Sequence, residues 1–263
     1  MDKIILTHSL KTKDDSNVLV VGRCRTGKTN FFVEPNLLSL KDSVIVIGRD
    51  DDMLFEETAN YRKEKLKQNI YTKKDFIPNG EELEFLGSQY TIYLTASPFY
   101  HEERIKLLHY SFRYIVDCIY YSYGNFVPEE PVTIIIDDLS LFPVYGDFLI
   151  NPPYNVRIVA TVQSIRDLLK IYGEAYTENI LNSFKIKMFF HINDLSDAEY
   201  IVNNYNPQIS KEEILQLKSN ECLILGLKDK PVLAKDKIIH WFTYGKPQER
   251  GFRSLIKGII SKV

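Results

Sequence analysis

Short runs of apolar, mostly β-branched residues recur along the chain and alternate with segments of helical periodicity. A strand that is buried on both faces of a sheet is apolar along its whole length, and these runs have the length of such strands. We expect strands at residues 17–21, 43–47, 91–94, 132–136, 158–162 and 186–190. Strands that alternate with helices predict an α/β fold, with a mostly parallel sheet flanked by helices on both faces.

Apolar residues spaced three or four apart predict the helices between these strands. One such stripe consists of Ile105, Leu108, Phe112, Ile115 and Ile119, and a second of Ile165, Leu168 and Leu169. Gly173 suits the end of the second helix. Two Ser-x-x-Glu pairs have the spacing of a capping box, which predicts helix starts at Ser196 and Ser210.

The remaining segments show weaker patterns. Residues 221–225, a turn at 228–231 and the run from Val232 onward predict a C-terminal β-hairpin. Residues 68–89 and 142–154 lack a clear period, and the second contains three prolines, so we expect both to be irregular.

The composition is that of a soluble globular protein, with 44% hydrophobic and 26% charged residues among 263. A net charge of -2 excludes a generally basic surface, so any contact with nucleic acid would have to be local. The three cysteines have no zinc-binding spacing, and a reducing cytoplasm suits them best. No run of about 18 apolar residues predicts a membrane span. We expect one domain over 1–263 and a cytoplasmic protein, either free or peripheral at the inner face of the cell membrane.

The sharpest motif lies between the first run and the helical stretch that begins near Lys28. It matches G-x-x-x-x-G-K-[ST], the P-loop, in the strand–loop–helix context that the motif requires. Such a loop wraps its backbone N–H groups around phosphate oxygens, and the helix start adds its positive dipole end. Lys28 should reach the β- and γ-phosphates of ATP, and the Thr29 hydroxyl should bind Mg²⁺. The expected nucleotide-binding residues are Gly22, Arg23, Cys24, Arg25, Thr26, Gly27, Lys28, Thr29 and Asn30. Many such loops carry glycine in place of Arg25, so an altered loop geometry is possible.

Two carboxylates, Asp137 and Asp138, directly follow the apolar run 132–136. A buried, unpaired carboxylate is costly, and a neighbouring Mg²⁺ would offset that cost. We therefore expect Asp137 to hold the metal through water together with Thr29, and Asp138 to polarise the attacking water. Glutamate is commoner in that second role, and Asp is one methylene shorter, which predicts slow hydrolysis or a repositioned water. The alternative is a strand that simply ends in a polar turn.

Gln163 follows the run 158–162. Ligand sites of open α/β sheets lie beyond the carboxyl ends of the strands, so this side chain should face the γ-phosphate. We therefore expect Lys28, Asp138 and Gln163 to be the catalytic residues. From position alone, a helix-start residue that faces solvent is an equal alternative for Gln163.

Three blocks of residues together resemble the coupling-protein ATPases of type IV secretion and conjugation (TraG-type), in particular members from low-GC Gram-positive bacteria. The first block is the P-loop with the Pro-Asn-Leu-Leu of residues 35–38, and the second is residues 131–138. The third comprises residues 160–164, 171–173, 179–181, 193–194 and 198–201. The resemblance spans roughly residues 4 to 240.

The resemblance implies a RecA-like motor core that binds ATP with Mg²⁺ at the interfaces of a homo-oligomer, usually a hexamer. It implies single-stranded DNA or a relaxase–DNA complex as cargo, a separate membrane-anchored secretion component as partner, and a γ-phosphate sensor at Gln163. An arginine of a neighbouring subunit should complete the site, with Arg157 and Arg166 as candidates by position.

The chain also departs from this family. Members often carry N-terminal transmembrane helices, which the sequence of this chain does not predict. They usually also carry an all-α domain, and here we expect that domain to be much reduced, to about residues 97–125. Residues 49–53 read Arg-Asp-Asp-Asp-Met in place of Asp-Pro-Lys-Gly-Glu, and Asp138 replaces the catalytic Glu.

Three functional interpretations remain open from the sequence. The first is an ATP-hydrolysing motor subunit that moves DNA or nucleoprotein in conjugation or type IV secretion. The second is a nucleotide-binding adaptor or regulatory paralogue that does not hydrolyse ATP. The third is a motor for other cargo, such as a viral genome during packaging.

Overall fold

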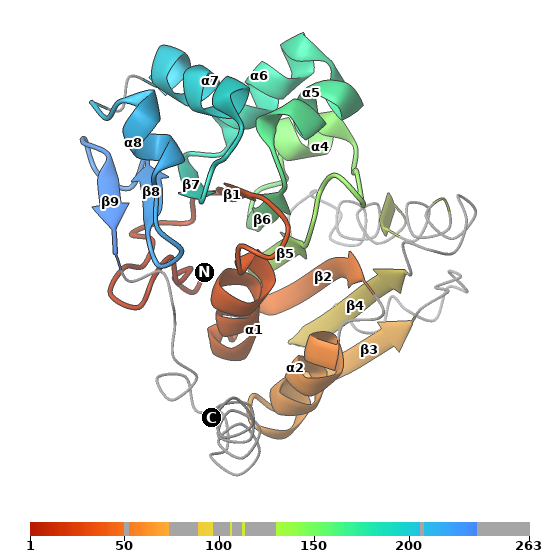
Figure 1. Cartoon of the computed structure of the whole chain (residues 1–263). Helices are drawn as coiled ribbons and strands as arrows, with labels where there is room; N and C mark the ends of the chain where they lie inside the picture. The colour runs from red at the N-terminus through yellow and green to blue at the C-terminus, as the bar shows by residue number, and fades with distance from the viewer. Residues whose placement is uncertain are drawn as a thin grey trace.

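The computed structural model describes residues 1–49, 53–73, 89–96, 106, 112–113, 130–205 and 208–235. Within these residues, nine strands form one sheet in the order β3-β4-β2-β5-β6-β1-β7-β8-β9 (Figure 1). All neighbours from β3 to β7 pair in parallel, whereas β7, β8 and β9 pair antiparallel. The strands are β1 (Val18–Gly22), β2 (Ser43–Arg49), β3 (Asn69–Lys73), β4 (Tyr90–Ala96), β5 (Val132–Ile136), β6 (Val156–Val162), β7 (Ile186–Phe190), β8 (Cys222–Leu225) and β9 (Val232–Ala234).

The six strands predicted from apolar runs are confirmed, and so is the C-terminal hairpin, formed by β8 and β9. The prediction of an irregular segment at 68–89 is wrong at its start, because residues 69–73 form β3. Among the described residues this strand pairs only with β4, at the edge of the sheet, and an edge strand needs no continuous apolar run.

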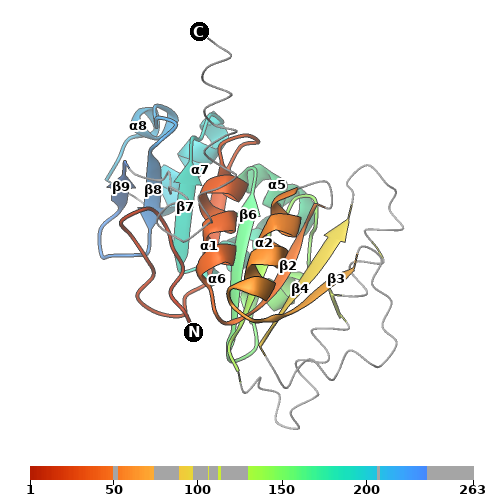
Figure 2. The same cartoon turned by 90° about the horizontal axis from the view of Figure 1, so that it is seen from below.

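Helices cover both faces of the sheet (Figures 1 and 2). One face carries α1 (Glu34–Ser39) and α2 (Met53–Glu64). A π-helical turn, η1 (Thr29–Val33), which is wider than an α-helix, leads directly into α1. The other carries α4 (Gly146–Ile150), α5 (Ile165–Tyr172), α6 (Glu174–Ser183), α7 (Leu195–Tyr205) and α8 (Lys211–Leu215). Each face has its own apolar core because successive strand residues point to opposite sides: Val18 and Val20 face one, Leu19 and Val21 the other. This confirms the α/β fold predicted from the alternating segments.

The helix signals in the sequence had mixed outcomes. The predicted helix at Ile165 is confirmed as α5; Gly173 ends it with a φ of 75°. The capping box of Ser210 is confirmed at the start of α8. The capping box predicted at Ser196 is wrong: α7 begins one residue earlier, and the Ser196 amide donates to the Asp194 carboxylate at 2.9 Å. Asp194 therefore caps this helix in place of Ser196.

Two further expectations concern the middle of the chain. Residues 142–154 are not wholly irregular, because Gly146–Ile150 forms the short helix α4. The helical insertion expected at about 97–125 lies outside the described residues, apart from Lys106, Phe112 and Arg113. Phe112 is buried and packs edge-on against Phe148, with ring centroids 5.4 Å apart. In the part of the chain that the structure describes, no helix has the length and apolar character to span a membrane.

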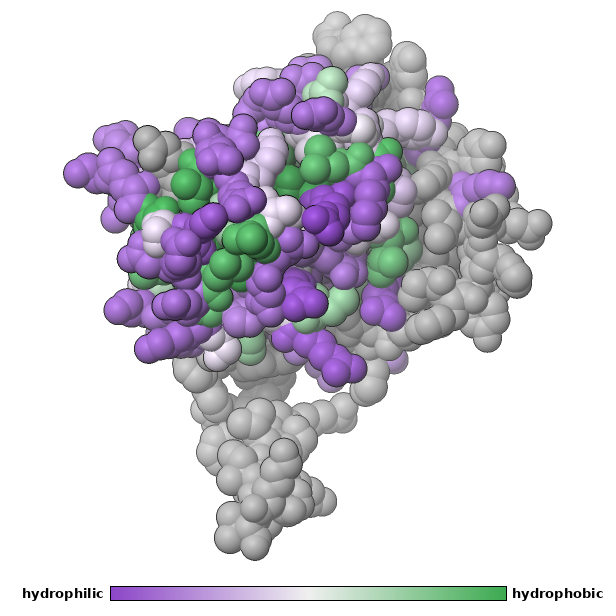
Figure 3. Space-filling view, turned by 45° about the horizontal axis from the view of Figure 1, so that its top comes forward, coloured by the Kyte–Doolittle hydropathy of each residue, from purple (hydrophilic) through white to green (hydrophobic). Residues whose placement is uncertain are grey.

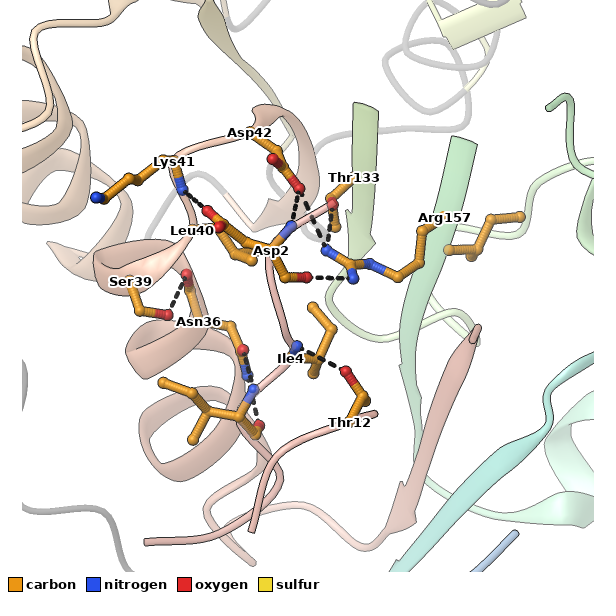
Figure 4. A network of polar contacts seen from close by, with 12 residues as sticks. Asp2, Ile4, Thr12, Asn36, Ser39, Leu40, Lys41, Asp42, Thr133 and Arg157 are labelled. Atoms are coloured by element: carbon orange, nitrogen blue, oxygen red, sulfur yellow. Dashed lines mark hydrogen bonds and ion pairs between the residues drawn. The ribbon is translucent and has the colours of Figure 1, made fainter. Parts of the chain in front are cut away.

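The N-terminal segment is fixed to α1 and to the sheet by polar contacts (Figure 4). The Asn36 amide nitrogen donates to the Ile5 carbonyl at 2.9 Å, and its oxygen accepts from the Ile5 amide at 2.8 Å. Arg157 is fully buried and donates to the Asp2 carbonyl at 2.6 Å and to the Thr133 hydroxyl at 2.8 Å. Arg157 lies near the start of β6, at the opposite end from Gln163. Its proposed role as an arginine that reaches a neighbouring subunit is therefore wrong.

Candidate nucleotide-binding site

The predicted P-loop connects the end of β1 at Gly22 to the helical turn that starts at Thr29. Gly27 has a φ of 88°, and a Cβ there would lie 2.2 Å from the ring of Phe31, so only glycine fits. Arg25 also adopts a left-handed φ, of 63°, which costs a residue with a side chain about 1–2 kcal/mol. The loop therefore keeps, at Arg25, a backbone conformation that glycine would adopt without strain.

The helix that follows the loop starts with an ordinary α-helical hydrogen bond and then widens over η1. The Glu34 amide donates to the Thr29 carbonyl, five residues back, whereas the Phe31 amide donates to the Gly27 carbonyl at 2.7 Å. Pro35 stands at the start of α1 and has no N–H to offer to the preceding turn. Asn30 lies exposed in the first turn, next to Thr29.

Lys28 points into the loop. Its ammonium group donates to the carbonyls of Gly22 and Arg23, the latter at 3.0 Å. Burial lowers the pKa of Lys28, and the negative charges of Asp138 and Asp137 oppose that shift. A buried cation beside backbone carbonyls is poorly compensated, and a phosphate oxygen would compensate it far better.

Asp137 is buried at the end of β5 and is held by two hydroxyl groups. Thr29 Oγ1 donates to one carboxylate oxygen at 2.8 Å, and Thr161 Oγ1 donates to the other at 2.9 Å. Burial raises the pKa of Asp137, while the hydrogen bonds from Thr29 and Thr161 lower it. The structure thus brings together the two residues predicted to hold Mg²⁺.

Asp138 turns away from the strand with a left-handed φ of 71°. Its amide donates to Thr161 Oγ1 at 2.8 Å. One carboxylate oxygen accepts from the amide and hydroxyl of Ser140, and the other accepts from the Gln163 amide nitrogen at 2.8 Å. The carboxylate therefore faces Gln163, at the carboxyl ends of β5 and β6.

Gln163 connects the acidic strand to the P-loop. Its amide oxygen lies 3.1 Å from Cys24 Sγ, which donates to it, and its amide nitrogen contacts Asp138. Because β6 lies between β1 and β5 in the sheet, the residue that follows it can reach both neighbours. The alternative of a solvent-facing Gln163 without partners does not hold.

The donor set suits Mg²⁺ and a nucleoside triphosphate. Thr29 and Asp137 offer a hydroxyl and a carboxylate oxygen within 2.8 Å of each other, and oxygen is the ligand that Mg²⁺ takes. A cation there would offset the cost of burying Asp137. Residues 22–29 provide the turn, and Lys28 the charge, that a phosphate group requires.

A cleft of about 800 Å³ opens beside the outer side of the P-loop. It is lined by three segments: the P-loop, the end of β6 with the start of α5, and the β7–α7 connection with the start of α7. The lining residues are Arg23, Cys24, Arg25, Thr26, Gln163, Ser164, Arg166, Asp167, Lys170, His191, Ile192, Asn193, Asp194, Leu195 and Asp197. Arg166 lies at this cleft, exposed and 3.7 Å from Asp194.

The face that carries α5 to α8 is mostly hydrophilic, with smaller apolar patches between (Figure 3).

The sequence interpretation assigned no role in the site to Thr161, Ser140 or Asn193. Thr161 occupies an alternating strand position and looked like part of the apolar core, yet its hydroxyl joins both acidic residues. In the amide orientation that satisfies its neighbours, the Asn193 oxygen accepts from Arg23 at 2.9 Å. No local spacing signals the contacts of Thr161 and Asn193, because their partners come from other strands or connections, whereas Ser140 contacts Asp138 two residues away.

The strand–loop–helix of the P-loop, the acidic strand beside it and the polar end of β6 define a P-loop NTPase fold. Residues 153–205 match the family described as the TraM recognition site of TraD and TraG. No curated protein is similar enough in sequence to match the chain.

Solved structures agree with this fold over most of the chain. The plasmid coupling protein TrwB in complex with the ATP analogue ADPNP has a TM-score of 0.64 at 12% identity, over 94% of this chain and 92% of that one. TrwBdeltaN70 in complex with sulphate has 0.61 at 12% identity, over 92% and 91%. VirB4 of Thermoanaerobacter pseudethanolicus has 0.59 at 12% identity, over 84% and 89%.

The chain thus has the RecA-like P-loop ATPase fold of TrwB and VirB4. Its resemblance to the type IV coupling-protein ATPases, drawn from three sequence blocks, is confirmed by the family match and the fold together. TrwB has also been solved with ADP and Mg²⁺.

Proposed function

We propose that the chain is an ATP-binding motor subunit of a conjugation or type IV secretion apparatus, which couples ATP hydrolysis to the movement of DNA or nucleoprotein. The observation that carries the proposal is the convergence of Lys28, Thr29, Asp137, Asp138 and Gln163 at the carboxyl ends of β1, β5 and β6. The likeness to coupling proteins and VirB4 supports the choice of apparatus.

Each residue has a distinct task in this proposal. The P-loop binds the phosphates, and Lys28 exchanges its loop carbonyls for phosphate oxygens. Thr29 and Asp137 hold Mg²⁺, which neutralises charge on the β- and γ-phosphates when it is bound. Asp138 accepts a hydrogen bond from the attacking water, and Gln163 faces the γ-phosphate from the end of β6.

The assembly in which this subunit works is part of the proposal. We expect a homo-oligomer, a hexamer by family resemblance, in which a neighbouring subunit supplies an arginine. Single-stranded DNA or a relaxase–DNA complex is the expected cargo, and a membrane-anchored secretion component the expected partner. The protein would then act in the cytoplasm or at the inner face of the membrane. A motor for other cargo, such as a packaged viral genome, would use the same site.

One observation favours a second candidate, a nucleotide-binding adaptor that does not hydrolyse ATP. Ser140 and Gln163 together contact both oxygens of the Asp138 carboxylate. These contacts occupy three of the roughly four acceptor positions of the carboxylate, which leaves it little capacity to orient an attacking water. The motor interpretation requires Gln163 to release Asp138 when nucleotide binds.

ATP turnover with Mg²⁺, with and without single-stranded DNA, distinguishes these functions. Wild type is compared with Lys28→Ala and Asp138→Ala, and binding of a labelled ATP analogue is measured in parallel. Lys218→Ala, which removes an exposed lysine outside the site, is the matched control. Turnover in wild type and the control, lost in both site variants, supports the motor. Binding lost only in Lys28→Ala, without turnover in any protein, supports the adaptor. Absence of both binding and turnover in wild type refutes nucleotide function altogether.

A further inference from the structure

Asp197 is a buried carboxylate on the first turn of α7, where acidic side chains commonly face solvent. Only 4% of the residue is exposed. Its Oδ2 accepts a hydrogen bond from the Ile165 amide, at 3.2 Å, at the start of α5. Asp197 therefore joins two helices that are separated in sequence by α6 and β7.

The start of α5 already has a local cap. Ser164 Oγ accepts from the Asp167 amide at 3.1 Å. Asp197 satisfies a different amide of the same turn, because a helix start leaves several N–H groups without partners inside the helix. Asp197 thus connects α7 to the start of α5, which Ser164 already caps.

Gln163 lies between two anchored points of the backbone. On one side, Val162 pairs with Val21 of β1 in the parallel sheet. On the other side, Ser164 and Ile165 begin α5, which Asp197 ties to α7. From this position the Gln163 side chain reaches Cys24 and Asp138. A shift of the α5 start would move the backbone from which Gln163 extends.

We propose that Asp197 is a positioning residue for Gln163, which it holds in place through the amide of Ile165. This inference rests on the proposed function in one respect, because that function gives Gln163 its place beside the γ-phosphate. The hydrogen bond between Asp197 and the Ile165 amide also connects α7 to the nucleotide site through the start of α5. α7 lies in the segment that matches the family model.

The surroundings of Asp197 make its hydrogen bond depend on pH. Burial raises the pKa of Asp197 to about 6, and the nearby Asp194 and Asp167 add to the shift, while the amides of Ile165 and Arg166 oppose it. The other charged or titratable groups that line the cleft beside the P-loop are Arg23, Cys24, Arg25, Arg166, Lys170 and His191. Protonation below pH 6 replaces a charge-assisted hydrogen bond with a weaker neutral one.

The test compares Asp197→Ala and Asp197→Asn with wild type. Glu199→Gln is the matched control, because this acid of α7 pairs with Lys211 at 3.0 Å and makes no contact with α5 among the interactions described. We expect Asp197→Ala to lower kcat roughly tenfold to a hundredfold, with KM for ATP changed less than about twofold. Asp197→Asn, whose amide oxygen can still accept, should restore part of that loss. We also expect wild-type kcat to fall on acidification through about pH 6, and Asp197→Asn should abolish this fall.

A second readout needs no turnover. The rate at which a thiol reagent modifies Cys24, followed by mass spectrometry of its peptide, reports whether Gln163 still accepts from that thiol. Gln163→Ala, the positive control, should raise the rate several-fold, and Asp197→Ala should raise it likewise, whereas Glu199→Gln should not. If wild type lacks ATPase activity, the proposed function fails, and the Cys24 rate alone decides the role of Asp197. If Asp197→Ala only lowers the melting temperature, with kcat per folded molecule and Cys24 rate unchanged, the inference is wrong.

Discussion

Thr161 is the residue whose replacement tests the site most directly. Its hydroxyl donates to the Asp137 carboxylate at 2.9 Å and accepts from the Asp138 amide at 2.8 Å. The residue is fully buried. Thr161→Val keeps nearly the same volume, so it deletes both hydrogen bonds with little change in packing.

The expected cost follows from these two contacts. A hydrogen bond to a charged acceptor contributes about 1.5–3 kcal/mol, and a buried amide left without a partner costs about 1–3 kcal/mol. Thr29 still donates to Asp137, so values near the middle of both ranges apply. We expect Thr161→Val to lower the free energy of unfolding by about 3–5 kcal/mol, a large share of the roughly 5–15 kcal/mol of a typical domain.

Urea unfolding at neutral pH without nucleotide measures this change, provided that the slope with denaturant stays constant. Thr161→Ser is the matched control, because it keeps the hydroxyl and removes one methyl group, at about 1 kcal/mol. Equal losses for Ser and Val would show that packing, and not the hydroxyl, accounts for the effect. A loss below about 1 kcal/mol for Val would refute the assignment of Thr161 as the link between the two carboxylates.

Three further predictions concern the loop, the buried arginine and pH. Gly27→Ala should weaken binding of a fluorescent ATP analogue by at least about tenfold, because its Cβ would meet the Phe31 ring at 2.2 Å. Arg157→Met should cost about 3–5 kcal/mol in thermal unfolding, because it leaves buried acceptors without their donor, whereas the exposed Arg166→Met should cost under about 0.5 kcal/mol. The pKa of Asp197 is raised from 3.8 to about 6 in the folded protein, so folded molecules bind the proton more tightly than unfolded ones. Stability should therefore fall by up to about 3 kcal/mol as pH rises from about 4 to 6, and Asp197→Asn should remove this slope in unfolding titrations.

Most of the sheet could be predicted because its strands are buried on both faces and read as apolar runs. β3 could not, since Asn69–Lys73, at the edge of the sheet, carries polar residues in place of a continuous apolar run. The P-loop and Asp137 were predictable because their chemistry fixes residue types at fixed local spacing. The contacts of Thr161 and Asp197 were not, since each joins segments that only the folded sheet brings together.

Lys28 and Asp137 explain why the site is costly to build and why its ligands suit it. Burial lowers the pKa of the lysine and raises that of the aspartate, so each charge is disfavoured where it stands. A protein selected for stability alone would replace both with apolar residues, since a buried ion pair is often no more stabilising than its hydrophobic substitute. The two groups instead face the partners that would offset their burial, a phosphate for Lys28 and a divalent cation for Asp137. Bound at one hundred times its dissociation constant, such a ligand stabilises the fold by about 2.7 kcal/mol. The proposed nucleotide binding would in this way be linked to folding through the same two side chains.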